Sequence, residues 1–188
     1  MAEMSRGLVV AKYKEDISWL EEVPEGIRVY VYDKSESGNL RNVGRDPHTW
    51  MHHIVAHYDE LDDWTSFVQG WPFDHYSKQL LMRDIVNVEK DYWELGKVKF
   101  SVIGSGLREC GDLPLTALYK ELMGKEVFTF EFVWGMQMIL SKRLILRRPK
   151  SFYIMLRDKA EELYMEKWSL PMLERIWGSI WWELENEL

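Results

Sequence analysis

Hydrophobic residues in the first third of the chain form three short runs separated by polar turns. The runs at residues 8–11, 27–32 and 64–69 are rich in β-branched and aromatic side chains, which is typical of strands. Residues 15–22, between the first two runs, have a helical pattern that ends at the Pro-Glu-Gly turn of residues 24–26. The second run has apolar or aromatic side chains at four consecutive positions, so we expect a central strand covered on both faces.

A helix start follows the polar loop after the second run. Asp46 is expected to be the N-cap, Pro47 the first helical residue, and Tyr58 the approximate end of the helix. One side of this helix is apolar at a spacing of three to four residues, which indicates packing on a sheet: Trp50, Met51, Ile54, Val55, Tyr58 and Leu61. The order of elements predicts an N-terminal βαβαβ unit with parallel strands.

The rest of the chain has a looser pattern. It predicts helices at residues 78–88, 151–164 and 171–187, a strand at 127–133, a short segment at 136–141 and a glycine-rich stretch at 104–111. We therefore expect an α/β fold with a Rossmann-like mixed sheet flanked by helices, in a single compact domain over residues 1–188.

Composition supports one core and excludes several classes of partner. Hydrophobic residues make up 46% of the 188 residues, enough for one sizeable core. The formal charge of −7 argues against nucleic acid and anionic membrane surfaces as partners. Cys110 is the only cysteine, so no intrachain disulfide can form. No stretch approaches the roughly 20 apolar residues of a membrane span, and the N-terminus has no signal-peptide pattern, so we expect a cytoplasmic location.

The segment Asn42-Val43-Gly44-Arg45-Asp46 joins the second strand to the helix and is the most informative local motif. Gly44 lets the backbone approach a ligand, Arg45 can bind a phosphate bidentately, and a helix N-terminus offers free N–H groups. This pattern suits a diphosphate site. An equally good interpretation is a turn with a salt bridge, because Asp46 as N-cap would occupy some of those donors.

Polar residues also follow the third strand. Gln69 ends it and Asp74 and His75 come after it, and ligands of open α/β sheets bind outside the carboxyl ends of the strands. We expect these side chains and the Asn42 loop to line one cleft.

All five histidines fall between positions 48 and 75: His48, His52, His53, His57 and His75. On one helix, His48 and His52 project from one flank of the apolar face and His53 and His57 from the other, which excludes joint ligation by all four. The pair His53 and His57 can still bind a metal with a third ligand. A metal-dependent hydrolase using this pair with His75 and Asp74 is therefore an alternative function.

Several motifs together resemble a family of uncharacterised domains found in fungi, algae, bacteria and large viruses, which carries an Asn-x-Gly-Arg-[Asp/Glu] element. The resemblance rests on residues 9–20, 30–34, 42–46, 58–70, 74–75 and 134–145, and on Leu173-Glu174-Arg175-Ile176-Trp177, so it covers nearly the whole chain. The layout is similar to that of glycosyltransferases of the GT-A type.

That resemblance implies transfer of a sugar from a nucleotide-diphosphate sugar to a glycan or other hydroxyl acceptor. Residues 7–76 would form the nucleotide-binding half and residues 77–188 the acceptor side. The implied donor-binding residues are Ala11, Tyr13, Asp16, Asp33, Asn42, Gly44, Arg45, Asp46, Gln69 and Gly70. Asp16 and Asp33 would contact the nucleoside base or ribose, although capping or turn formation explains each equally well.

One departure from GT-A enzymes affects the cofactor. They carry Asp-x-Asp where this chain has Gln69-Gly70-Trp71. Asp74 and His75 would have to hold a divalent ion such as Mn²⁺ or Mg²⁺, or Arg45 and the helix N-terminus would neutralise the diphosphate instead.

An inverting transfer needs a carboxylate that deprotonates the acceptor. Glu174 is the candidate base because it lies at the margin of an apolar stripe beside Trp181, and a salt bridge is its equally good alternative role. Asp74 is the second candidate. A third possible function is a non-catalytic domain that binds carbohydrate or protein through Trp71, Trp168 and Trp182.

Overall fold

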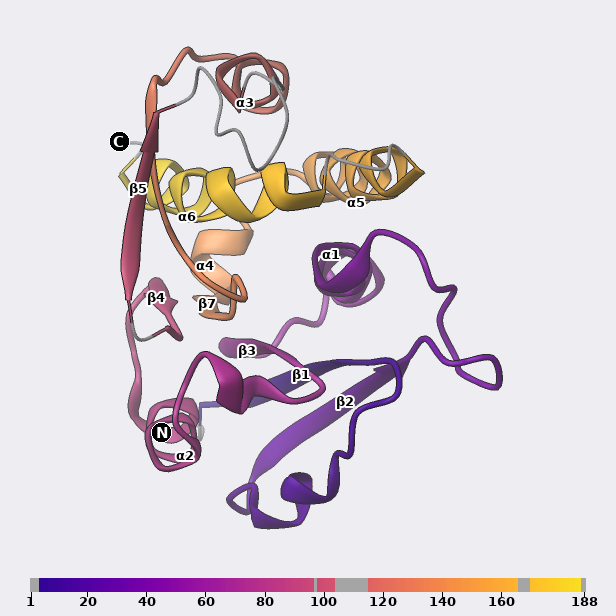
Figure 1. The fold of residues 1–188 in the computed structure, drawn as a ribbon. Coiled ribbons are helices and arrows are strands. Elements are labelled where there is room, and N and C mark those ends of the chain that lie inside the picture. Colours follow the sequence, from indigo (N-terminus) through magenta and orange to yellow (C-terminus); the bar gives the residue numbers. More distant parts are fainter. Residues whose placement is uncertain (1–3, 97, 104–114, 166–169, 187–188) are drawn as a thin grey trace.

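A five-stranded mixed sheet forms the centre of the fold, with the strand order β2-β1-β3-β7-β4 (Figure 1). The computed structural model describes residues 4–96, 98–103, 115–165 and 170–186. The strands of this sheet are β1 Arg6–Lys12, β2 Ile27–Asp33, β3 Trp64–Gln69, β4 Tyr92–Glu94 and β7 Met138–Ser141, and a second sheet pairs β5 Lys99–Ile103 with β6 Thr129–Val133. The helices are η1 Ser18–Glu22, α1 Arg45–His57, η2 Pro72–Asp74, α2 Lys78–Asn87, α3 Leu115–Met123, α4 Lys142–Ile145, α5 Lys150–Met165 and α6 Leu170–Asn186.

β1 is the buried central strand of the parallel part of the sheet, paired with β2 on one side and β3 on the other. Its side chains alternate between two cores: Val9 and Ala11 enter one, Leu8 and Val10 the other. A strand covered on both faces has no polar face, which explains the continuous apolar run in the sequence.

The expectation that the second strand is central is wrong, because β2 is the edge strand of the sheet. Val29 is 40% exposed, and Tyr30 and Tyr32 are only partly buried. One face of β2 lies against α1, where both tyrosine rings contact His53. This contact explains why an edge strand carries large aromatic side chains.

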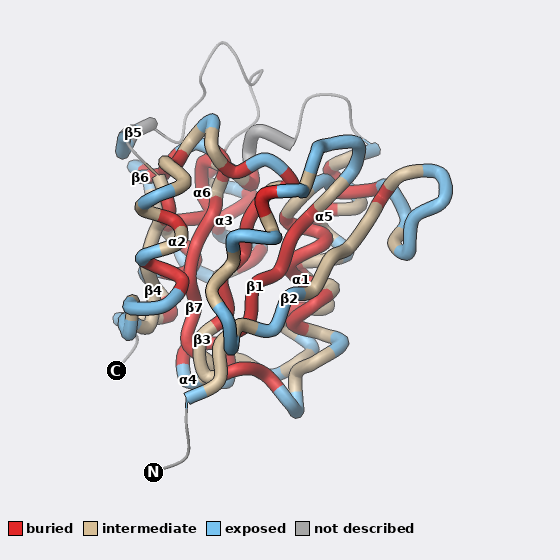
Figure 2. Tube along the Cα trace, turned by 90° about the horizontal axis from the view of Figure 1, so that it is seen from below, coloured by how far each residue is buried: buried red, intermediate tan, exposed pale blue. Residues whose placement is uncertain are grey.

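Helices cover both faces of the main sheet (Figure 1). α1, α5 and α6 pack on one face, and η1 and α2 on the other. The larger core extends from Val9 to Leu184 and includes Trp50 on α1, whose ring lies 6.2 Å from that of Trp177 on α6. Figure 2 shows this buried layer running through β1, β3 and β7 to the facing sides of α1 and α5. The N-terminal and C-terminal halves of the chain thus share one core, as the predicted single α/β domain requires.

Other elements differ from the sequence-based expectations. The predicted helix at residues 15–22 is only the 3₁₀ turn η1, and β4, β5 and α3 were not predicted. The strand expected at 127–133 is β6, which belongs to the second sheet. The glycine-rich stretch 104–111, including Cys110, lies outside the described residues. None of the described helices is long and apolar enough to cross a membrane.

Candidate functional site

The carboxyl ends of the three parallel strands lie side by side. Ala11, at the end of β1, is in register with Tyr32 on β2 and with Gln69 on β3. β2 is added on one side of β1, and the chain then crosses to β3 on the other side, so the order in which parallel strands are added to the sheet reverses at β1. Such a reversal leaves a crevice at the carboxyl edge, the usual ligand position in open α/β sheets.

The start of α1 lies at this edge, and a buried lysine organises it. Gly44 and Arg45 both have positive φ angles, 60° and 46°, which turn the chain sharply into the helix. Lys34, only 5% exposed, donates hydrogen bonds from Nζ to the carbonyl oxygens of Val43 (2.7 Å) and Arg45 (2.5 Å). Two of the three ammonium protons are used in this way, and the third can bind a ligand.

The prediction that Asp46 caps α1 is wrong. The N-cap is Gly44, in the left-handed conformation, and Asp46 lies within the first helical turn. Asp46 instead accepts a hydrogen bond at Oδ2 from Nε2 of Gln69 (2.9 Å). The side chain therefore links the start of α1 to the end of β3 and leaves the helix N–H groups to other partners.

A pocket of about 390 Å³ opens beside this turn. Its walls come from the end of β1, the loop after β2, the start of α1 and the end of α5: Ala11, Lys12, Tyr13, Glu15, Lys34, Asn42, Arg45, Asp46 and Tyr164. We call it the α1 pocket. It brings together five of the predicted donor-binding residues, Ala11, Tyr13, Asn42, Arg45 and Asp46.

Three further predicted residues adjoin the α1 pocket without lining it. Gly44 precedes Arg45, and Gln69 donates a hydrogen bond to Asp46. Gly70 lies under Glu15, whose Oε2 is 2.6 Å from where a Cβ of residue 70 would be. Any side chain at position 70 would therefore displace the Glu15 carboxylate.

Four residues of the pocket were not predicted from the sequence: Lys12, Glu15, Lys34 and Tyr164. For Lys12 and Lys34 a signal was present, because each lies at the end of a parallel strand or directly after it, where ligand-binding side chains gather. Tyr164 comes from α5, far away in sequence, and no local pattern connects it with β1.

Charges in and near the pocket are strongly perturbed. Burial lowers the pKa of Lys34 to about 8, against a weaker opposing effect of Asp46. Burial raises the pKa of the Asp46 carboxyl, and the hydrogen bond from Gln69 opposes this shift. Lys12 forms an ion pair with Asp33 and, with the amide of Ser35, lowers the pKa of Asp33 to about 2. The guanidinium of Arg45 is exposed and makes no hydrogen bond or ion pair within the described chain.

Asp16 and Asp33, predicted to contact the nucleoside, do not line the α1 pocket. Asp16 is exposed and accepts hydrogen bonds from the amide (2.9 Å) and hydroxyl (3.0 Å) of Ser18. These bonds, first that of the amide, lower its pKa and start η1. Asp33 is bound to Lys12 and to the amide of Ser35. Both carboxylates thus bind amides of turns, as in their alternative explanation, and Asp33 also pairs with Lys12.

Asp74, His75 and Glu174 lie outside the lining of the α1 pocket. Glu174 Oε1 accepts a hydrogen bond from the amide of Gly135 (2.9 Å), and Arg175 forms an ion pair with Oε2 (3.4 Å). The salt bridge considered as the alternative role of Glu174 is thus present. On its other side Gly135 faces His75, whose Cδ2 is 2.6 Å from where a Cβ would be. Among the described residues, no three His, Cys, Asp or Glu side chains are grouped to hold a metal ion.

The helix places the remaining histidines as expected, in two pairs. His48 and His52 stack at 6.4 Å between ring centroids, and His53 and His57 lie 4.6 Å apart. His53 is 1% exposed, and its Nδ1 is 3.0 Å from the hydroxyl of Tyr32. The hydrolase alternative thus has no metal-ligand set in the described part of the chain.

The three tryptophans considered for ligand binding differ in environment. Trp71 is 42% exposed and its ring packs edge-on against Phe73 at 4.8 Å. Trp182 on α6 is 57% exposed, and Trp168 lies outside the described residues.

Comparison with known proteins gives one match. A family described as "Protein of unknown function (DUF3431)" matches residues 8–91. No curated protein and no solved structure matches the chain. The matched segment contains every residue of the α1 pocket except Tyr164, whereas Glu174 lies beyond it. The segment that builds the α1 pocket is therefore similar to an uncharacterised family.

Proposed function

We propose that the protein is a glycosyltransferase that binds a nucleotide-diphosphate sugar in the α1 pocket. One observation carries this proposal: Lys12, Lys34 and Arg45 converge with the N-terminus of α1 at the carboxyl edge of parallel strands. A diphosphate needs concentrated positive charge and N–H donors, and a helix N-terminus beside cationic side chains supplies both.

The three cations have different roles in this proposal. Arg45, exposed and uncommitted within the described chain, binds the diphosphate through its guanidinium. Lys34 fixes the loop that carries Arg45 and contributes its third proton. Lys12, at the end of β1, is held in place by its ion pair with Asp33 at the end of β2. Asp74 and His75 do not line the pocket, so in this proposal the three cations neutralise the leaving group in place of an ion held by Asp74 and His75.

Sugar transfer breaks the bond between the anomeric carbon and the diphosphate oxygen and forms a bond to the acceptor oxygen. The nucleoside diphosphate leaves with the bonding electrons, and the acceptor proton passes to a base. Two carboxylates line the pocket, Glu15 and Asp46. Burial raises the pKa of Asp46, which makes it a stronger base than an exposed aspartate. We assign this role to Asp46 in place of Glu174 or Asp74, because of these three carboxylates Asp46 alone lines the pocket, and its pKa is the one that burial raises.

Isothermal titration with UDP, GDP, CDP and dTDP, each with and without Mn²⁺ or Mg²⁺, tests the donor site. At least one diphosphate should bind, and Arg45→Ala should weaken that binding about tenfold or more, the equivalent of a lost charge-assisted hydrogen bond. Arg143→Ala is the matched control, because Arg143 pairs with Asp91 in a different crevice. Equal losses in both variants, or no diphosphate binding at all, would show that the proposal is wrong.

Turnover is a second and separate measurement. The sugar conjugates of the nucleotide that binds should release nucleoside diphosphate slowly to water and faster with a hydroxyl acceptor. Asp46→Asn should abolish the release of nucleoside diphosphate and leave the affinity for the nucleotide unchanged. Binding without release in the native protein would indicate a nucleotide-binding domain. Loss of thermal stability with EDTA and no nucleotide effect would favour the metal-dependent hydrolase.

A further inference from the structure

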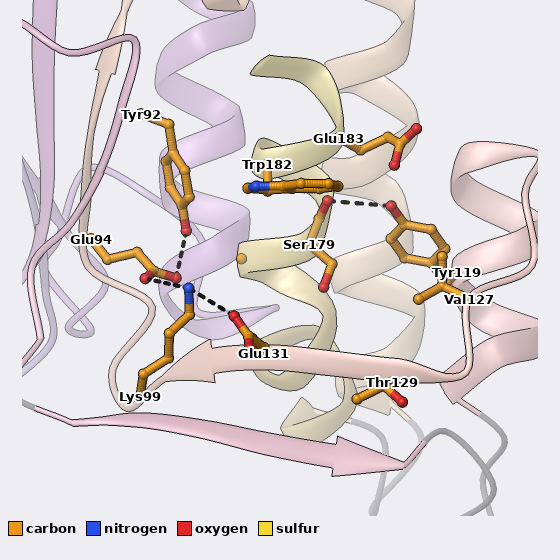
Figure 3. A pocket seen from close by; sticks show the side chains of 11 residues that line it. Tyr92, Glu94, Lys99, Tyr119, Val127, Thr129, Glu131, Ser179, Trp182 and Glu183 are labelled. Atoms are coloured by element: carbon orange, nitrogen blue, oxygen red, sulfur yellow. Dashed lines mark hydrogen bonds and ion pairs between the residues drawn. The ribbon is translucent and has the colours of Figure 1, made fainter. Parts of the chain in front are cut away.

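A second pocket lies between α6, α3 and the second sheet (Figure 3). Its volume is about 300 Å³, and it shares no lining residue with the α1 pocket. We call it the α6 pocket. Its walls come from α6, α3, β4, β5, β6 and Val127, which precedes β6, so it belongs to the part of the chain outside the family match.

A group of polar side chains in mutual contact forms one side of the α6 pocket. Glu94 accepts a hydrogen bond at Oε1 from the hydroxyl of Tyr92 (2.9 Å). Lys99 lies between two carboxylates, 3.5 Å from Oε2 of Glu94 and 3.0 Å from Oε2 of Glu131 (Figure 3). Acceptor oxygens and ammonium protons thus alternate along this side within hydrogen-bonding distance of one another.

Gly178 on α6 makes this arrangement possible. A Cβ at this position would be 2.9 Å from Oε1 of Glu94 and 2.9 Å from the carbonyl oxygen of Glu131. Only a residue without a side chain lets the carboxylate and β6 approach the helix so closely. The Glu94 carboxylate and the backbone of β6 are therefore packed closely against α6.

An exposed indole forms the adjoining wall. Trp182 follows Gly178 by one helical turn and is 57% exposed, although α6 otherwise buries Trp177 and Trp181 almost completely. In Figure 3 its ring lies between the group of Tyr92, Glu94 and Lys99 and the side chain of Tyr119. Large aromatic side chains that remain exposed beside fixed polar groups are typical of ligand sites, because one ligand can use both.

We propose that the α6 pocket binds a sugar residue of a glycan. A pyranose ring has an apolar face of C–H groups that can lie on Trp182, and a rim of hydroxyls that both donate and accept hydrogen bonds. Glu94 and Glu131 accept from such hydroxyls, and Lys99 donates to them. Anionic ligands are disfavoured, because carboxylates outnumber lysines among the lining residues. This inference does not depend on nucleotide binding in the α1 pocket.

Saturation-transfer NMR on the full chain, with malto-, cello-, manno- and chito-oligosaccharides as probes, tests the proposal. At least one series should bind. Trp182→Ala should weaken it at least tenfold, whereas Trp182→Phe, which keeps an aromatic ring, should retain most of the affinity. Trp71→Ala is the matched control, since Trp71 is also exposed but lies outside the α6 pocket, and it should have no effect.

Three results would overturn the assignment. The first is that none of the four series binds, and the second is that Trp182→Ala binds as well as the native protein. The third is Trp182-dependent binding of choline but of no sugar, which would make this a cation site. Nucleoside diphosphate titrations of Trp182→Ala and sugar titrations of Arg45→Ala separate the two pockets. Each variant should lose one ligand and keep the other, so failure of one proposal is not failure of the other.

Discussion

Lys34 donates a hydrogen bond from its buried ammonium to the carbonyl oxygen of Arg45, 2.5 Å away, and so fixes the residue proposed to hold the diphosphate. The same ammonium binds the carbonyl of Val43, two residues earlier. Arg45 has a positive φ angle, which L side chains adopt only at a cost in free energy. The lysine thus stabilises a strained turn from a neighbouring strand end, and Arg45 extends from that turn into the pocket.

Replacing this lysine should destabilise the fold. Lys34→Met keeps an unbranched side chain of similar length but removes the Nζ donor from both carbonyls, so that of Val43 loses the hydrogen bond from Lys34 and that of Arg45 keeps the hydroxyl of Thr49, 3.4 Å away. Each unsatisfied buried acceptor costs about 1 to 3 kcal/mol, offset in part by the removal of a buried charge. We expect a loss of about 2 kcal/mol in the free energy of unfolding, measured by urea denaturation. Lys120→Met, which breaks only the exposed ion pair with Glu126, should change it by less than about 1 kcal/mol. Equal losses of unfolding free energy in the two variants would mean that Lys34 does not stabilise the turn at Val43 and Arg45.

Nucleotide affinity should fall above about pH 8. Burial lowers the pKa of Lys34 from 10.5 to about 8, so the folded protein loses this proton while the unfolded chain keeps it. The buried charge therefore costs stability below pH 8, and the cost disappears as the pH rises from 8 to 10.5. The neutral amine can still donate to the two carbonyls, but it has no third proton for a phosphate. Calorimetric titration of the tightest-binding diphosphate from pH 7 to 9.5 should show a decline of about tenfold. Lys34→Met should bind weakly with no such decline.

Gly44 should tolerate alanine much less well than Gly26. Both have positive φ angles, 60° and 89°, so alanine at either position costs about 1 to 2 kcal/mol for the left-handed backbone. At Gly44 the new Cβ would also lie 2.5 Å from Cβ of His48 and 3.0 Å from the carbonyl oxygen of Ala160, whereas nothing lies within 4 Å at Gly26. Gly44→Ala should therefore lower the melting temperature clearly more than Gly26→Ala. A similar decrease in both variants would mean that α5 does not constrain the start of α1.

Hydrophobic pattern predicted the parts of the fold that depend on local sequence. β1, β3 and the apolar side of α1 are where the runs and the helical spacing indicated, because burial on both faces or on one side leaves a direct periodic signal. β4 has only three residues, too few for a period to appear. The edge position of β2 was not predictable from the sequence. A helix such as α1 buries the aromatic side chains on one face of a strand whether or not another strand pairs with its free edge.

The α1 pocket was predictable only in part. Five of its residues were predicted from strand ends and the helix start, and the position of Lys34 directly after β2 is a further signal, but nothing in the local sequence indicates that this lysine is buried. Its burial results from the path of residues 35–44, which no local rule specifies. Glu174 was correctly placed at the margin of an apolar stripe. The turn at Gly135 determines what it binds, and that turn holds it away from the pocket.

Mild acid should destabilise the protein through the buried histidines of α1. Burial lowers the pKa of His48 to about 4 and that of His53 to about 3, whereas both imidazoles titrate near 6.5 in the unfolded chain. Their titration therefore does not affect stability above pH 6.5, and stability declines as the pH falls from 6.5 toward 4, because only the unfolded chain takes up the protons. By pH 5 the loss is about 2 kcal/mol for each histidine. Urea denaturation of the native protein between pH 7 and 5 should show this decline. His53→Gln, which keeps a partner for the hydroxyl of Tyr32, should be less stable at pH 7 but show about half the decline. An unchanged decline in this variant would mean that His53 does not remain neutral in the folded protein.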